Sequence, residues 1–333
     1  MSAAPGRPSS RAVLLLSLKV LFSIALMLFL FSRIPLASLS EVIRHASAPL
    51  LAAAFGVLVA SNILGAWQWN QLLSAVGIRI PFWKVCAYYH VGLFFNNFLP
   101  ANIGGDIARV ADASRYGTTT ATAFSTVLMD RLVGTVALAG LAVVTTLPAM
   151  DQFHLKVAYA ALLAFFAFSV TVIWAVFHPG LLPALERLLA RVGLASMKPH
   201  LDDLAARLAD FRDQRGLIIR LVSIAVVVQV SRIGVHMLVA RALGLSIPAA
   251  YFFLFVPLLA VIVSLPISLN GIGVREGAGV VLFGLVGVGR AQAFALQFTT
   301  YLVAVAVSLL GGLVFLIRIP HRRAGSNPRR RTT

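Results

Sequence analysis

Six apolar runs separated by polar segments set the pattern of the chain. They occupy residues 12–32, 48–69, 122–147, 155–177, 217–243 and 293–317. A helix of roughly 20 apolar residues crosses the hydrocarbon layer of a membrane. The pattern therefore predicts an all-α polytopic membrane protein with about six full spans. Trp67 and Trp69 end the second run and fit an interfacial aromatic belt.

Two further apolar stretches are interrupted by residues that break helices. In the first break, at 96–109, Pro100 removes a backbone donor and the pair Gly104 and Gly105 permits non-helical dihedrals. The second break, at 265–276, repeats these features with Pro266, Gly271 and Gly273. Backbone freed in this way is tolerated at membrane depth only where it is buried in protein or lines a wet cavity. We therefore expect two re-entrant or broken helical hairpins.

The two breaks share one spacing. Arg109 follows Pro100 by nine residues, and Arg275 follows Pro266 by nine residues. Equal spacing predicts corresponding elements in two pseudo-symmetric halves. Counting the spans makes the first hairpin enter from the cytoplasmic side and the second from outside, the inverted arrangement common in secondary transporters.

Composition and charge indicate where the protein is located and which partners it is expected to have. The chain is 59% hydrophobic and 12% charged, with a net charge of +17. In a soluble protein this charge would suggest nucleic acid, but positive loops facing anionic lipid explain it here, so no nucleic-acid partner is expected. We predict a multi-pass protein of the cell membrane with both termini cytoplasmic.

The expected layout follows from the same pattern. A single membrane domain, residues 12–317, lies between a cytoplasmic tail (1–11) and a basic cytoplasmic tail (318–333). Inside it, the polar amphipathic segment 178–216 separates a first half, 12–177, from a second half, 217–317.

Polar residues at the breaks indicate a binding site for an anion. Guanidinium groups bind phosphate in a bidentate fork, and amides exposed at a broken helix start add to the site. The residues predicted to bind substrate are Asn96, Asn97, Asn102, Arg109, Arg232, Asn270 and Arg275. Arg232 shares one helical face with Gln229 and His236, so this stripe is expected to face the same cavity.

An alternative role for the arginines is structural. Arg109 would tie its hairpin to Asp106 or Asp130, and Arg275 would pair with Glu276. Both roles can coexist. Asp130 and Arg131 lie early in the span 122–147, where they either face the bundle interior or sit at the membrane surface.

The motifs of common enzymes are missing from the sequence. There is no Walker loop, nucleophile elbow or His-Glu-x-x-His pair, and Asp202–Asp203 has no third ligand spaced to complete a metal site. Part of a CDP-alcohol phosphotransferase signature at 105–109 lacks its downstream aspartates. We expect no enzyme activity, cofactor or metal.

Three segments in order resemble a known family: 96–109, Asp130–Arg131–Leu132 and 265–276. Together they are similar to the lysylphosphatidylglycerol synthase transmembrane region family, a group described as flippase-like membrane proteins. The resemblance covers nearly the whole chain. It implies translocation of a lipid between leaflets, which in two-domain members is aminoacylated phosphatidylglycerol made by a separate soluble domain. This chain ends at Thr333, so we expect no soluble synthase domain.

The functional prediction is a lipid flippase for a phosphate-bearing lipid that is aminoacylated, glycosylated or polyprenyl-linked. Its partners would be an anionic or glycosylated membrane lipid and a lipid-modifying enzyme or glycosyltransferase. Two alternatives stay open. One is a membrane-embedded glycosyl- or phosphotransferase that uses Asp106, Asp112 or Glu276, and the other is a scaffold for lipid-modifying enzymes. The sequence gives no oligomeric state.

Overall fold

The computed structural model describes residues 41–98, 104–153, 156–177, 214–265 and 270–324, together with Leu21, Leu28, Phe29, Phe211 and Ser268. Throughout these residues the regular structure is helical. This confirms the all-α prediction. The expected span 12–32, nearly all of the segment 178–216, and the hairpin residues Pro100, Asn102 and Pro266 lie outside the described part of the chain.

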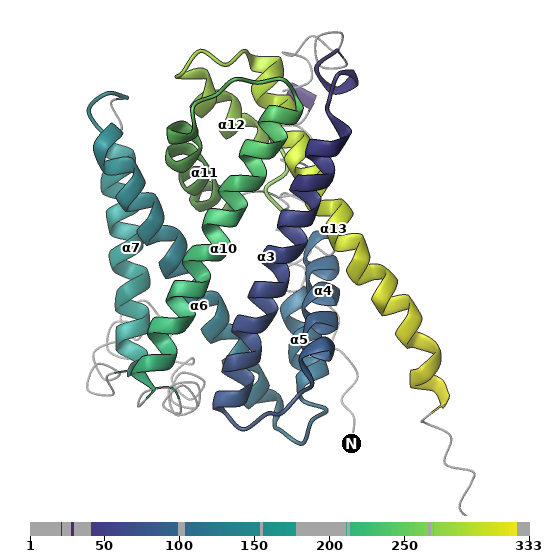
Figure 1. Ribbon diagram of the computed structural model, residues 1–333. Helices are drawn as coiled ribbons and strands as arrows, with labels where there is room; N and C mark the ends of the chain where they lie inside the picture. The colour runs from purple at the N-terminus through teal and green to yellow at the C-terminus, as the bar shows by residue number, and fades with distance from the viewer. Residues whose placement is uncertain are drawn as a thin grey trace, which may run out of the picture.

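Five described helices are long and apolar enough to cross a membrane. They are α3 (Ala48–Ala75), α6 (Thr120–Thr146), α7 (Lys156–Phe177), α10 (Arg215–Ala242) and α13 (Arg290–Ala324). Each covers one of the apolar runs predicted to span, to within one residue at its ends. Figure 1 shows them running between the same two ends of the molecule, with α3 and α10 side by side.

Four shorter helices form two pairs between these spans. α4 (Phe82–Phe98) packs on α5 (Gly104–Ala113), and α11 (Ala249–Ser264) packs on α12 (Val274–Gly284). In Figure 1, α4 and α5 occupy the lower part of the bundle while α11 and α12 occupy the upper part. The two interrupted segments thus form helix pairs that enter from opposite ends, as the inverted arrangement predicts.

The turn before α12 explains how the second pair reverses direction. Asn270, Gly271 and Gly273 have φ angles of 52°, 76° and 81°, in the left-handed region that glycine and asparagine adopt most easily. The side-chain amide of Asn270 donates to the carbonyl of Asn97 at 2.8 Å. The ends of the two helix pairs therefore touch inside the bundle.

Glycines allow two close backbone approaches around the first pair. A Cβ on Gly105 would collide with the carbonyl of Gly92, so α5 can lie against α4 only without a side chain at this position. A Cβ on Gly311 of α13 would collide with the carbonyl of His90 in α4. Glycine at this position therefore lets α13 pack closely against α4.

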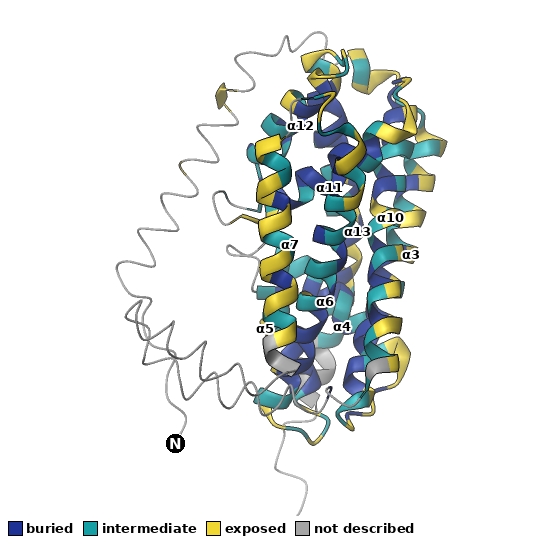
Figure 2. Cartoon of the chain, turned by 90° about the vertical axis from the view of Figure 1, so that its left-hand side faces the viewer, coloured by how far each residue is buried: buried dark blue, intermediate teal, exposed yellow. Residues whose placement is uncertain are grey.

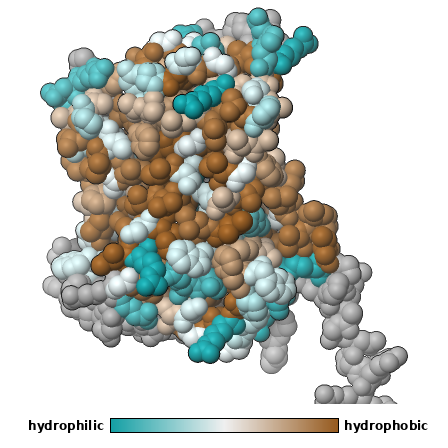
Figure 3. Space-filling model, viewed as in Figure 1, coloured by the Kyte–Doolittle hydropathy of each residue, from teal (hydrophilic) through white to brown (hydrophobic). Residues whose placement is uncertain are grey.

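The buried side chains form two hydrophobic clusters, and each cluster takes residues from both halves of the chain. Trp69, Leu72 and Met129 belong to the cluster around α3, α4 and α6, and Phe255 and Phe283 belong to the cluster around α11 and α12. Figure 2 shows buried residues inside the bundle and exposed residues along α7. On the face seen in Figure 3, hydrophobic atoms form a broad middle zone with hydrophilic atoms toward the upper and lower ends. A surface of this kind suits a molecule embedded in a membrane.

Candidate functional site

A cavity of about 620 Å³ lies where the two helix pairs meet. Its walls come from α3, α4, α5, α6, α10, α11, the turn at Asn270 and α12. Its lining includes every described residue predicted to bind substrate: Asn96, Asn97, Arg109, Arg232, Asn270 and Arg275. Asp130, Arg131, Gln229 and His236 also line it, whereas Asp106 and Glu276 do not. Residues more than 170 positions apart along the chain therefore share one site, as the Asn270–Asn97 hydrogen bond shows.

Two ion pairs cross between α5 and α6 beside this cavity. Arg109 bonds to Asp130 with an Nη2–Oδ2 distance of 2.8 Å. Arg131 contacts both oxygens of Asp106, through Nη2 at 3.0 Å and Nε at 3.1 Å. The spacing of the four residues on their helices brings each acid against the base of the other helix. The pairs therefore fix α5, the returning helix of the first pair, to the spanning helix α6.

Aromatic rings complete the surroundings of Arg109. Its guanidinium carbon lies 4.2 Å from the ring centroid of Trp69 and 4.8 Å from that of Tyr89. Cation–π contacts of this kind strengthen when the cation is desolvated, and Arg109 is only 4% exposed. Arg109 thus has the structural role that the sequence analysis gave as an alternative.

The second arginine has different contacts. Arg275 donates from Nη2 to the carbonyl of Asn270 at 3.0 Å, and its guanidinium lies 4.5 Å from the ring of Tyr301. Glu276, expected as its partner, is fully buried and instead accepts from the backbone N–H of Gly273 at 2.7 Å. That carboxylate caps the start of α12, where the helix dipole favours a negative charge.

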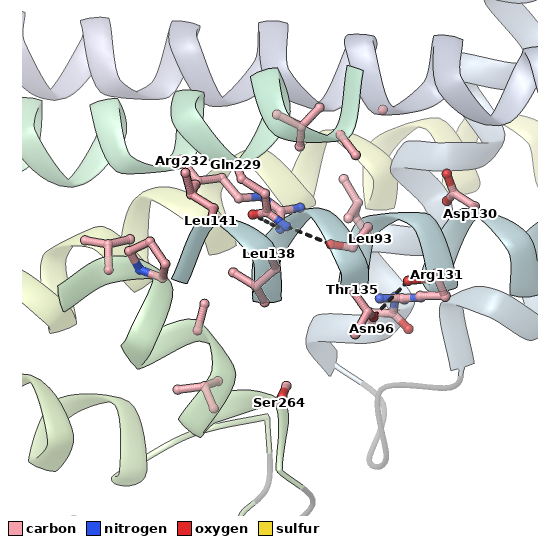
Figure 4. A pocket seen from close by; sticks show the side chains of 18 of the residues that line it. Leu93, Asn96, Asp130, Arg131, Thr135, Leu138, Leu141, Gln229, Arg232 and Ser264 are labelled. Atoms are coloured by element: carbon pink, nitrogen blue, oxygen red, sulfur yellow. Dashed lines mark hydrogen bonds between the residues drawn. The ribbon is translucent and has the colours of Figure 1, made fainter. Parts of the chain in front are cut away.

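The polar stripe of α10 faces the cavity, as its spacing predicted. Gln229 donates to the carbonyl of Gly134 in α6 at 3.4 Å, and Arg232 lies 3.5 Å from the amide oxygen of Gln229. Figure 4 shows Gln229 and Arg232 together, near Leu138 and Leu141 of α6. Polar groups on one helix therefore lie opposite an apolar wall on another.

The asparagines are less free than the sequence suggested. The side-chain oxygen of Asn96 accepts from the N–H of Gly105 at 2.9 Å, which satisfies a donor at the start of α5. Asn270 is bonded to Asn97 across the two hairpins. Both side chains therefore hold the hairpins together, and binding of substrate by them stays a prediction.

Some residues of the site gave no readable signal in the sequence. Trp69 was assigned to the interfacial belt, but it is fully buried and stacks on Arg109, whereas Trp67 is 41% exposed. Gln68 donates to Asp130 at 2.9 Å from inside α3, where it was read only as part of a span. Tyr89 and Tyr301 likewise lie in apolar helices. Their roles depend on contacts between distant helices, which spacing alone does not reveal.

The fold and the cavity define a class of protein. A helical bundle with an apolar surface, opposed short helix pairs and an internal polar cavity is the architecture of a polytopic integral membrane protein. Residues 16–323 match the family model described as the lysylphosphatidylglycerol synthase TM region, and the chain belongs to that family. A comparison with curated proteins gives no match.

Proposed function

We propose that the protein moves a phosphate-bearing lipid between the two leaflets, passing the head group through the cavity. The observation that carries the proposal is the convergence of Arg232 and Arg275, from α10 and α12, on one cavity inside an otherwise apolar bundle. Charged residues inside a membrane segment are costly, and they are typical of transport pathways. Family membership supports the same kind of function.

The walls of the cavity support a lipid rather than a small soluble substrate. Beside its polar groups the cavity is lined by apolar side chains of α6 and α11, among them Leu138, Leu141, Val256 and Leu259. Arg232 is exposed although it lines the cavity, so the site is open on the side of α10. An amphiphile can place its head group against the arginines while its tails stay in apolar surroundings.

The contacts of the carboxylates favour translocation over a transferase. A general base has to be within reach of its substrate. Asp106 is held by Arg131, Glu276 caps α12, and Asp112 is buried beside Arg115 and Arg318. All three acids considered for catalysis have structural contacts, so we propose no chemical step.

Charge suggests the orientation. The segment between α7 and α10 contains Arg187, Arg191 and Arg207, and six arginines lie between Arg318 and Arg331. By the positive-inside rule we place the cytoplasm at the end where α7 finishes and α10 begins. The first helix pair then enters from the cytoplasmic side.

The test is leaflet transfer in proteoliposomes with headgroup-labelled anionic and glycosylated lipids. Wild-type protein should transfer at least one of these lipids, and Arg275→Gln should lower the rate by about tenfold or more because a charge-assisted hydrogen bond is lost. The matched control is Arg220→Gln, which removes an exposed arginine of α10 that bonds to Gln71 instead of lining the cavity. Its rate should stay near that of wild type. Absence of transfer for every lipid by folded wild-type protein would contradict the proposal.

A further inference from the structure

The balance of charge in the cavity indicates which lipid head group it can bind. This inference rests on the proposed function. Four arginines line the cavity against a single aspartate: Arg109, Arg131, Arg232, Arg275 and Asp130. Two of the arginines have partners, since Arg109 is paired with Asp130 and Arg131 with Asp106. The other two, Arg232 and Arg275, determine the sign of the net charge of the cavity.

Arg232 and Arg275 have neutral partners. The contacts are the amide oxygen of Gln229 for Arg232 and the carbonyl of Asn270 for Arg275. Within the described ranges no carboxylate lies within 4 Å of either guanidinium. Nη1 of Arg275 is buried and has no hydrogen-bond partner. A buried donor without a partner is costly, so it marks a place where a ligand oxygen would be stabilised.

Other nearby groups do not cancel this charge. Glu276 lies outside the cavity lining and caps α12, and even if its charge is set against Arg275, that of Arg232 stays unmatched. Residues 99–103, 266, 267 and 269 of the hairpin tips carry no ionisable side chain. His236 is either neutral or adds positive charge. Among the residues that the structure describes, the cavity is therefore positive in either state of His236.

The one acid in the cavity lining, Asp130, and its neighbour Asp106 also lack a free oxygen for a cation. Asp130 accepts from Gln68 at Oδ1, at 2.9 Å, and from Arg109 at Oδ2, at 2.8 Å. Both oxygens of Asp106 bond to Arg131. An ammonium group entering the cavity would meet guanidinium charges without a free carboxylate to receive it.

We infer that the cavity selects a lipid whose head group has a net negative charge and excludes one that carries an added ammonium group. In the subset of family members described above, the lipid is aminoacylated, so this inference separates two of the substrates that the sequence left open. A phosphodiester bearing hydroxyls, a phosphomonoester or a diphosphate meets the requirement. Phosphatidylglycerol that carries a lysyl ester does not, because its two ammonium groups outweigh the single phosphate charge.

The experiment measures equilibrium binding of two lipids with identical acyl chains, phosphatidylglycerol and its lysyl ester, to the full chain by native mass spectrometry. We expect wild-type protein to prefer phosphatidylglycerol by about tenfold or more, since the ammonium groups of the lysyl ester are repelled by the guanidinium charges of the cavity. Equal or tighter binding of the lysyl ester would overturn the inference.

Variants locate the selectivity. Arg275→Gln and Arg232→Gln should each reduce the preference toward parity, whereas Arg275→Lys and the control Arg220→Gln should keep it. An unchanged preference in both glutamine variants would also overturn the inference, because selectivity would then arise elsewhere. The wild-type comparison remains decisive if a variant fails to fold. Binding is read without transfer, so a clear preference with no leaflet transfer would refute the proposed function and leave the charge selectivity standing.

Discussion

Arg109 and Arg275 occupy equivalent places in the sequence but differ in their surroundings. Arg109 meets a carboxylate and two aromatic rings, while Arg275 meets one carbonyl and one ring. The equal spacing after a proline predicted two corresponding arginines. It could not predict the difference, because Asp130 and Trp69 reach Arg109 from other helices. We conclude that Arg109 stabilises the first hairpin, and we propose that Arg275 is the better anion ligand.

The ion pairs of the first hairpin should differ in their contribution to stability. Asp130→Asn removes the closer carboxylate of the buried Arg109 and leaves only Asp106, at an Nη1–Oδ1 distance of 3.9 Å. Breaking a buried pair costs about 3–5 kcal/mol. Asp106→Asn should cost at most about 1 kcal/mol, because Arg131 is 50% exposed and water replaces the lost contact. Thermal unfolding in detergent measures both.

Asp151→Asn is the control for these two variants, since Asp151 and its partner Lys156 are both largely exposed. Its unfolding temperature should equal that of wild type. A larger loss for Asp106→Asn than for Asp130→Asn would contradict the assignment of Arg109 as the structural arginine.

At the scale of single elements, the hairpins depend on close backbone contact more than on hydrophobic area. Most of α5 is polar or small, and it lies against α4 through Gly105 and Gly92. From the sequence, the glycine pair and the proline predicted an interruption of the helix. The identity of the helix that Gly105 contacts could not be predicted, because a glycine has no side chain whose type points to a partner.

Gly105→Ala should destabilise the protein. The added Cβ would collide with the carbonyl of Gly92 and crowd the side chain of Asn96, so either α5 moves or the cap of its first turn is lost. We expect a cost of about 1–3 kcal/mol, as for overpacking in a core. The measurement is again thermal unfolding, with leaflet transfer as a second readout.

Gly56→Ala is the matched control on α3, where a Cβ meets nothing within 4 Å. Alanine is the better helix former, so this change should be neutral or slightly stabilising. If Gly105→Ala behaves like Gly56→Ala, then the close approach of α4 and α5 is not a constraint on the fold.

At the scale of the whole molecule, the sequence predicted the architecture well. The long apolar runs predicted the described spanning helices, and the two interruptions predicted the opposed helix pairs. Both features can be predicted because the length of an apolar run and a helix-breaking residue are local properties of the sequence. The cavity could be predicted only in outline. Its charge balance depends on which acid pairs with which arginine. These pairs form between different helices and therefore depend on how the helices pack.

The orientation can be checked with two single cysteines in a Cys86→Ser background. Ser74 lies at the end of α3, and Ser246 lies in the connection between α10 and α11, near the opposite end of the bundle; both are exposed. If the basic segments are cytoplasmic, a membrane-impermeant maleimide should label Ser246→Cys in intact cells. Ser74→Cys should react only after permeabilisation. The reverse pattern would invert the orientation, and labelling of both from one side would refute the topology.

Blocking the cavity tests the central claim most directly. Thr135 lines the cavity from α6, whereas Thr120 is exposed at the start of the same helix. In a Cys86→Ser background, leaflet transfer by Thr135→Cys should fall to near the protein-free level after reaction with a bulky maleimide, while Thr120→Cys keeps its rate after the same treatment. Equal transfer before and after complete modification of Thr135→Cys would contradict passage of the head group through this cavity.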